Sequence, residues 1–383
     1  MFHRCLPILI LFAWSSRLSA QDSSYVRKVL KHLCSPECYG RGYLKNGLTH
    51  AETYLLNEIK KSGALPLFSE GYTQKFYHGV NTFPSAMRVK LNGVLLEPGR
   101  DFIPQPGAMG AKGHALLYKT DSTHFSGLIG TQIIRLAVKK KLTYSVANKV
   151  NNACELDMLP LTVLRDTNTV EIKMKNKFVK HFISKNIGCM IKGTGKSDSC
   201  LVFTAHYDHL GGLGKSCYFP GANDNASGVS MVLSFLNYYV SHPSKYSCVF
   251  VFFAGEEAGL LGSKYFVESG CMDLHKIKFL INLDLLGTGD DGIMVVNGAV
   301  HEKIFDKLTG INAQKQLVTQ IKKRGKAANS DHYWFSEAGV PCFFVYTMGG
   351  ISAYHDINDK ESTLPLTAYR SVFTLLTNFM ETF

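Results

Sequence analysis

After its first residues, the sequence lacks any apolar run of the roughly 20 residues that a membrane-spanning helix needs. It also lacks internal repeats and low-complexity tracts, which argues against a repeat architecture. Of its 383 residues, 45% are hydrophobic and 19% are charged, as in ordinary globular proteins. The length therefore indicates one large domain, or a domain that carries an insert.

The apolar run that bears on export is short and lies at the N-terminus. Arg4 precedes the apolar residues 6–14, and small and polar residues follow up to Ala20. This order is typical of a signal peptide over residues 1–20, cleaved after Ala20. The alternative is a retained N-terminal anchor, because Arg17 is unusual near a cleavage site. We expect a secreted or periplasmic protein that is not stably inserted in a membrane after cleavage.

Acidic residues are fewer than basic ones, 30 against 42, which gives a formal net charge of +12. The excess of lysine and arginine gathers at residues 139–141, 173–185 and 322–324. These runs have no interleaved aromatic residues and belong to no recognisable nucleic-acid-binding module. We interpret them as a solvated basic face and expect no nucleic-acid partner.

Cysteine does not define a disulfide framework. Ten cysteines are present, and loss of Cys5 with the signal peptide leaves an odd number. Cys34 and Cys38 flank a short Ser-Pro segment and could pair in an oxidising compartment, although spacing alone does not decide this.

Three regions differ in their hydrophobic patterns. Residues 25–33 and 48–62 are predicted to be helices. Between residues 77 and 183 short alternating segments predict a β-rich insert of unknown role, with a hairpin turn at Asn92-Gly93. From residue 186 onward, apolar runs alternate with amphipathic stretches. Strands are predicted at 187–191, 200–205, 247–253, 279–284, 293–296 and 341–347, and helices at 226–239, 260–268, 301–308, 331–338 and 366–380.

Uniformly apolar strands that alternate with helices are typical of a buried sheet covered on both faces. The predicted fold is therefore α/β, with an open, largely parallel twisted sheet and helices on both faces. We expect residues 21–76 and 184–383 to form one catalytic domain, interrupted by the insert at 77–183.

Potential metal ligands follow the strands of this sheet. Such sheets bind ligands beyond the carboxyl ends of their strands. Each residue alone has an ordinary structural explanation; Asp224, for example, precedes a helix and could be its N-cap. Together, two histidines and several carboxylates at converging strand ends indicate a metal site, and imidazole with carboxylate but without cysteine suits zinc, with cobalt or manganese as alternatives. The residues concerned are His206, Asp208, Asp224, Glu256, Glu257, Asp284 and His355.

Spacing suggests how these residues divide the chemistry. In an extended chain residues i and i+2 point the same way, so Asp208 can lie beside His206 and fix its tautomer. Glu256 and Glu257 are adjacent, so their side chains diverge. One of the two can bind metal while the other faces the substrate as a general base.

The motifs AHYDHLG, GANDNASG, FFAGEEAGLLGS, NLDLLG, SDH and YHDINDK, in this order, resemble the co-catalytic zinc aminopeptidase family. That family includes bacterial leucyl and aminoacyl aminopeptidases, glutamate carboxypeptidase and the glutaminyl cyclases. The resemblance covers residues 186–383, and the segment 33–66 resembles the start of the family's catalytic domain.

The resemblance implies two zinc ions per chain. His206 and Asp284 would bind one ion, Glu257 and His355 the other, and Asp224 would bridge them. Glu256 would then be the general base and Asp208 the partner of His206. The implied activity is that of a metallo-aminopeptidase acting on peptides with a free N-terminus.

Two other functions fit the same motifs. A glutaminyl cyclase shares the fold and the ligand positions, but the residues that flank Asp224 and Glu257 are more similar to those of the peptidases. A non-catalytic binding ectodomain would have no use for the base at Glu256. Aminopeptidase activity is therefore the leading hypothesis.

Overall fold

The computed structural model describes residues 23–383, so the predicted signal peptide at 1–20 lies outside the described residues. No helix within 23–383 has the length and apolar character that crossing a membrane requires. Cys34 and Cys38, whose pairing the sequence left open, are both free and buried.

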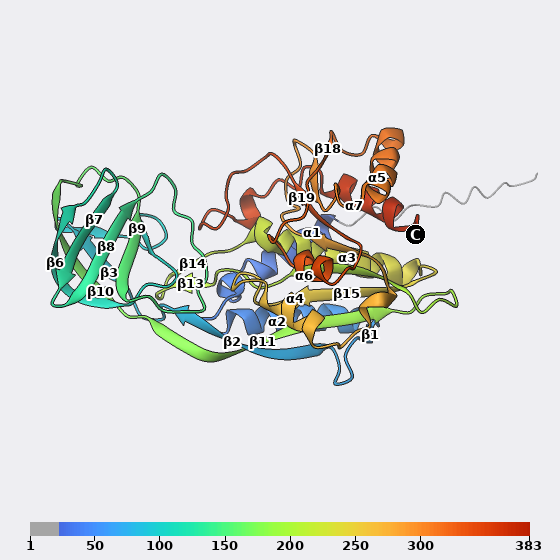
Figure 1. Cartoon of the computed structure of the whole chain (residues 1–383), viewed down its shortest axis with the longest axis horizontal. Helices are drawn as coiled ribbons and strands as arrows, with labels where there is room; N and C mark the ends of the chain where they lie inside the picture. The colour runs from blue at the N-terminus through green and yellow to red at the C-terminus, as the bar shows by residue number, and fades with distance from the viewer. Residues whose placement is uncertain (1–22) are drawn as a thin grey trace, which may run out of the picture.

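The larger part of the molecule is built on a nine-stranded sheet with the order β1-β11-β15-β12-β16-β19-β17-β18, in which β2 also pairs with β11 (Figure 1). Its strands are β1 (Leu65–Pro66), β2 (Thr73–Thr82), β11 (Lys177–Ile191), β12 (Cys200–His206), β15 (Ser247–Phe253), β16 (Ile277–Leu283), β17 (Ile293–Val296), β18 (Ile321–Lys323) and β19 (Cys342–Thr347). The four central strands β15, β12, β16 and β19 are parallel, whereas β11 and β17 run antiparallel to their central neighbours. The predicted open α/β sheet is confirmed, with its parallel pairing concentrated in these central strands.

Helices cover both faces of this sheet, as predicted. The helices are α1 (Ser23–Leu33), α2 (Gly47–Ser62), α3 (Gly228–Ser241), α4 (Leu261–Glu268), α5 (Glu302–Lys315), α6 (His332–Glu337) and α7 (Tyr369–Met380). Apolar side chains of α1, α2, α3, α5 and α7 share one core with Leu201 and Phe203 of β12. Phe266 of α4 and Phe335 of α6 share a second core with Val202, which points to the opposite face.

Residues between β2 and β11 form a separate eight-stranded sheet with the order β4-β3-β10-β6-β7-β8-β9-β5. Its strands are β3 (Arg88–Leu91), β4 (Val94–Leu96), β5 (Phe102–Pro104), β6 (Ala111–Lys119), β7 (His124–Ile129), β8 (Gln132–Val138), β9 (Ala153–Met158) and β10 (Thr167–Met174). The predicted hairpin at Asn92-Gly93 joins β3 to β4. The long strands β2 and β11 reach from the main sheet to this second sheet, so they overlap the ends of the predicted insert at 77–183 (Figure 1).

Arg41 holds the N-terminal segment against the centre of the main sheet. Its side chain is fully buried and donates hydrogen bonds to five backbone carbonyls. The acceptors, at 2.7–3.1 Å, are the carbonyl oxygens of Leu33, Tyr207, Pro220, Gly221 and Asp224. Gly40 precedes Arg41 with φ 70°, and a Cβ there would come within 2.2 Å of the Gly211 carbonyl oxygen. This close approach requires glycine.

Replacement of Arg41 is expected to destabilise the protein strongly. In Arg41→Met the five carbonyls lose their donor inside the core, which should lower the free energy of unfolding by about 3–5 kcal/mol. Urea denaturation of the metal-free protein measures this. The control is Arg135→Met, because Arg135 pairs with Glu155 at the surface and its loss should cost less than about 1 kcal/mol. Equal stabilities of the two variants would contradict the role given to Arg41.

Candidate metal centre

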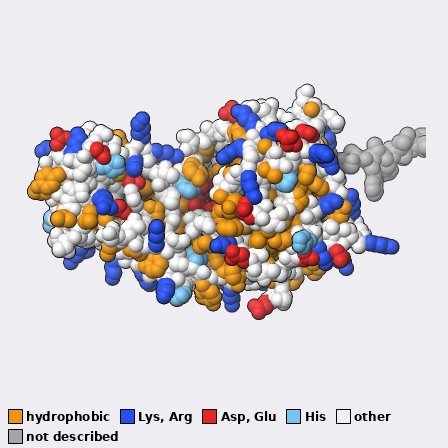
Figure 2. Space-filling model, in the orientation of Figure 1, with side chains coloured by type: hydrophobic (Ala, Val, Ile, Leu, Met, Phe, Trp, Pro, Cys, Tyr) orange, Lys and Arg blue, Asp and Glu red, His pale blue; other side chains and the backbone are white. Residues whose placement is uncertain are grey.

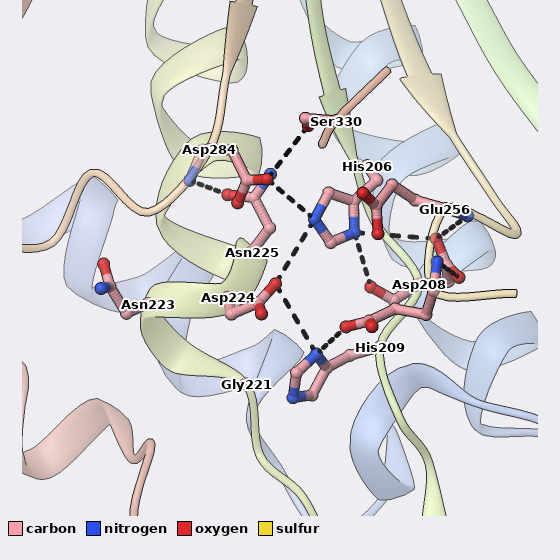
Figure 3. Close-up of polar contacts among 12 residues, drawn as sticks. His206, Asp208, His209, Gly221, Asn223, Asp224, Asn225, Glu256, Asp284 and Ser330 are labelled. Atoms are coloured by element: carbon pink, nitrogen blue, oxygen red, sulfur yellow. Dashed lines mark hydrogen bonds and ion pairs between the residues drawn. The ribbon is translucent and has the colours of Figure 1, made fainter. Parts of the chain in front are cut away.

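The predicted site residues come together at the carboxyl ends of the central strands. His206 ends β12, Glu256 and Glu257 follow β15, and Asp284 follows β16. Asp224 lies in the turn of irregular helical conformation at Ala222–Ser227 before α3. In Figure 3, His206, Asp224 and Asp284 point toward one another from different elements.

A first group of ligand atoms surrounds His206. Its Nε2 lies 3.4 Å from Asp224 Oδ1 and 3.4 Å from Asp284 Oδ2. The carboxylate of Glu256 belongs to the same group, since ligand atoms of His206, Glu256 and Asp284 all lie within 4.8 Å of one another.

A second group surrounds Glu257. His355 Nε2 lies 3.5 Å from Glu257 Oε2 and 3.0 Å from Asp224 Oδ2. The two oxygens of Asp224 thus face the two groups, one toward His206 and the other toward His355. Glu256 and Glu257 diverge, as predicted from their adjacency, and each belongs to a different group.

Asp208 contacts residues of both groups. It is fully buried, and its carboxylate lies 3.7 Å from Nδ1 of His206, while its carbonyl oxygen lies 3.2 Å from the same nitrogen. The carboxylate also accepts hydrogen bonds from the backbone N–H groups of Glu256 and Glu257, at 3.2 and 3.4 Å. Asp208 is therefore placed to orient the His206 ring and to hold the turn that carries both glutamates.

A buried chain of hydrogen bonds ends on Asp284. Thr204 Oγ1 donates to Asn282 Oδ1, Asn282 Nδ2 donates to Ser330 Oγ, and Ser330 Oγ donates to Asp284 Oδ2 at 3.1 Å. The SDH motif, which begins at Ser330, supports a candidate ligand through this serine. Asp331 and His332, which follow, are the N-cap and the first residue of α6 and are fully buried.

Two further residues of the site were not selected from the sequence. His209 is fully buried, and its Nδ1 lies 2.7 Å from Glu257 Oε1 and 3.8 Å from Asp224 Oδ1. Asp359 accepts hydrogen bonds from the backbone N–H groups of Asn223 and Asp224. His209 stands in the motif AHYDHLG, three positions after His206. Its place in this motif was the one sequence signal that could have added it to the candidate ligands.

The electrostatics of the site are those of carboxylates crowded in a buried space. Burial, with the neighbouring Asp224 charge, raises the pKa of Glu257 to about 8, and burial also raises the pKa values of Glu256 and Asp284. Burial would do the same to Asp224, but hydrogen bonds from His206 and His355 bring its pKa well below its ordinary value. The pKa of His355 is raised to about 9 because nearby Glu257 and Asp224 outweigh the effect of burial.

This donor set fits divalent metal ions. Carboxylates and imidazoles are ligands that zinc accepts, and a cation would compensate the crowded negative charge. Two buried atoms of the set, Asp284 Oδ1 and His209 Nε2, have no hydrogen-bond partner among the described residues.

A cavity of about 370 Å³ opens onto these groups. Four carboxylates border it, from Asp224, Glu256, Glu257 and Asp284. Its other walls are partly apolar and aromatic, and they include Leu260, Leu285, Phe344, Tyr346 and Tyr354. In Figure 2, acidic and histidine side chains are visible in a recess between the β-rich part of the molecule and the rest.

The Peptidase family M28 model matches residues 186–380, about half of the chain and the part that carries every candidate ligand. The chain belongs to this family.

Curated relatives that are named aminopeptidases align with this chain over part of their length. Aminopeptidase YwaD of Bacillus subtilis is 30% identical over 178 residues, which cover 45% of this chain and 38% of YwaD. A probable leucine aminopeptidase of Trichophyton verrucosum is 29% identical over 180 residues, which cover 45% of this chain and 49% of that protein. The alignments thus span less than half of these relatives.

Solved structures of this M28 fold match nearly the whole chain. The zinc aminopeptidase BSAP from Bacillus subtilis superposes with a TM-score of 0.67 at 19% identity, covering 92% of this chain and 94% of BSAP. The aminopeptidase from Aneurinibacillus sp. strain AM-1 gives a TM-score of 0.61 at 17% identity and covers 94% of both chains. At these identities the likeness concerns the fold.

Loss of the Ser330 hydroxyl should weaken metal binding at the His206–Asp284 group. In Ser330→Ala, Asp284 loses the hydrogen bond that orients it, and outer hydrogen bonds of this kind contribute roughly tenfold to metal affinity. Zinc titration of the metal-free protein against a chromophoric chelator measures the change. Ser336→Ala is the matched control, because Ser336 lies in α6 and bonds Asn297 instead. Unchanged zinc affinity in Ser330→Ala would show that the hydrogen bond is dispensable.

Proposed function

We propose that this member of family M28 is a secreted or periplasmic metallo-aminopeptidase that hydrolyses the N-terminal peptide bond of peptides with two zinc ions. The observation that carries the proposal is the convergence of five candidate ligands and Glu256 on one cavity. Aminopeptidases among the curated relatives and solved structures support it.

In this proposal His206 and Asp284 would hold one zinc ion, Glu257 and His355 would hold the other, and Asp224 would contribute an oxygen to each. The 3.0 and 3.4 Å distances from opposite oxygens of Asp224 to the two histidines support a bridging role. His355 is preferred to His209 as a ligand because His355 borders the cavity, whereas His209 is buried behind Glu257.

Glu256 is the proposed general base. When bound, two zinc ions would polarise the scissile carbonyl and lower the pKa of a water molecule. The Glu256 carboxylate accepts a proton from the attacking water and returns it to the leaving amine nitrogen as the carbon–nitrogen bond breaks. Asp208 assists by holding the backbone of the Glu256-Glu257 turn.

The charge of the cavity favours a substrate with a free N-terminus. Four carboxylates border a small space whose other walls are partly apolar. Zinc would compensate the ligand carboxylates of Asp224, Glu257 and Asp284, so the Glu256 carboxylate is the one left to attract a protonated α-amino group, and an N-acetylated peptide loses that attraction. The small volume favours a terminal residue over the middle of a long chain.

The same proposal covers the organisation of the chain. Residues 1–20 would direct export, residues 21–76 and 184–383 would form the catalytic domain, and residues 77–183 would be its insert. The β3–β10 sheet has its own apolar core, to which Leu210, Leu213 and Phe219 from outside the insert also contribute, and this core supports treating the insert as a unit.

Substitution of the two adjacent glutamates should separate base from ligand. Glu256→Gln should keep two zinc ions yet lower turnover at least ~10²-fold, the scale of general-base catalysis. Glu257→Gln should instead lose zinc, because it removes a ligand carboxylate. Elemental analysis and turnover of an aminoacyl-arylamide measure both effects. If the two variants have the same zinc content, the assignment within the pair is wrong.

A Gln-initiated peptide distinguishes hydrolysis from cyclisation. We expect mass spectrometry to show loss of the whole N-terminal residue, and no reaction with the N-acetylated form of the same peptide. Loss of ammonia with the residue retained would identify a glutaminyl cyclase. Absence of both reactions, in protein that binds zinc, would favour a binding protein.

A further inference from the structure

The loop between β8 and β9, residues 139–152, connects the β-rich insert to the metal centre. β8 and β9 are parallel neighbours in the insert, so the chain must cross over between them. It does so without regular helix or strand. Ser145, at the middle of this loop, borders the cavity that contains the candidate metal ligands.

The main chain of Tyr144 forms two hydrogen bonds with the candidate ligand His355. The backbone N–H of Tyr144 donates to the carbonyl oxygen of His355 at 2.9 Å. The carbonyl oxygen of Tyr144 lies 3.0 Å from Nδ1 of the His355 ring. A residue of the insert therefore contacts both the backbone and the side chain of His355.

The second of these contacts decides which ring nitrogen is available to a metal ion. A carbonyl oxygen only accepts, so Nδ1 of His355 must carry the proton. In the neutral ring that binds a metal ion, the lone pair is then on Nε2, the atom that faces Asp224 and Glu257 at 3.0 and 3.5 Å. Histidines that bind metal generally donate their other N–H group to a carbonyl or carboxylate in this way.

Lys141 ties the same loop to the turn that carries His355. Its Nζ donates to the carbonyl oxygen of Ser352 at 2.8 Å and lies 3.0 Å from Asp356 Oδ2. Asp356 Oδ1 in turn accepts from the backbone N–H of Asn358 at 2.8 Å. This support matters because His355 has φ 52°, a left-handed conformation that surrounding contacts must hold.

The loop is itself anchored on both sides. The ring of Tyr144 is buried and stacks on Phe219, with 5.0 Å between centroids and 9° between planes. Phe219 and Leu210 come from the segment after β12, yet both belong to the apolar core of the insert, together with Leu142. Insert and metal centre therefore share one core at this point.

We propose that the 139–152 loop is a working part of the metal centre: Tyr144 and Lys141 position His355 so that Nε2 can bind the metal ion shared with Glu257. The proposal rests on the function proposed above. It assigns the insert a positioning role for one of the two metal ions, while Ser330 and Asp208, both outside the insert, bond Asp284 and His206 of the other group.

The test compares the two metal sites in the variant Lys141→Met. Because Lys141 is half-exposed, this substitution removes the contacts with Ser352 and Asp356 without creating a cavity in the core. Zinc affinity is measured by chelator competition, and anomalous scattering at the zinc edge in crystals at limiting zinc shows which site fills. We expect about two- to fivefold weaker binding at the Glu257–His355 site, because the half-exposed Lys141 acts on His355 through the turn that it supports, and unchanged binding at the His206–Asp284 site. Ser330→Ala should show the opposite selectivity.

Lys140→Met is the matched control, because Lys140 is the exposed neighbour in the same basic run and should leave both affinities unchanged. Two zinc ions bound by Lys141→Met with wild-type affinity would overturn the loop's role and leave the proposed function intact. Equal weakening at both sites would also overturn it, since that is the effect of a general loss of structure. Wild-type protein that binds fewer than two zinc ions would overturn both proposals.

Discussion

The buried guanidinium of Arg41 is the contact on which the geometry of the site depends. Its five carbonyl acceptors belong to the end of α1, to the turn after β12 and to the turn before α3. His206 ends β12 directly before the first of the last two turns, and Asp224 lies in the second; the two residues have to meet although they come from different parts of the sheet. A buried charge is tolerated only where hydrogen bonds surround it, so all five acceptors must stay close to the Arg41 guanidinium. Arg41 therefore holds the two turns and the end of α1 close to one another.

Crowding of negative charge is the second constraint. Asp208, Asp224, Glu256, Glu257 and Asp284 lie within a few side-chain lengths of one another, and burial makes each additional charge expensive. The surrounding polar groups are arranged to hold carboxylates in place: Ser330 bonds Asp284, and the backbone N–H groups of the glutamate turn bond Asp208. Hydrogen bonds of this kind orient ligands but do not neutralise them, which is why the site suits a divalent cation better than a neutral ligand.

Local patterns predicted much of this architecture. The strands at 247–253 and 293–296 were predicted at their observed bounds, because short uniformly apolar runs bounded by polar turns have few other structures open to them. The meeting of His206 with Asp284 followed from the rule that parallel strands present their carboxyl ends at one edge, whereas the place of Asp224 beside them was implied by the family resemblance. The bonds of Arg41 were not predictable, since its acceptors at Pro220 and Asp224 lie far along the chain. The contact of His209 with Glu257 was missed for the same reason: it depends on how two loops pack, which no local pattern encodes.

The orientation of the insert toward the metal centre could not be predicted from the sequence. Alternating strands and turn residues predicted a β-rich region at 77–183, but periodicity says nothing about which side of that region faces the rest of the molecule. The answer lies in the loop after β8, whose Tyr144 packs on Phe219 and bonds His355. Since β2 and β11 belong to the main sheet and also lead into the insert, the insert is continuous at both ends with that sheet, in which β11 pairs with the site strand β15. The shared apolar core packs this part of the chain against the segment after β12, so a structural element outside the family's matched segment can contact the metal centre.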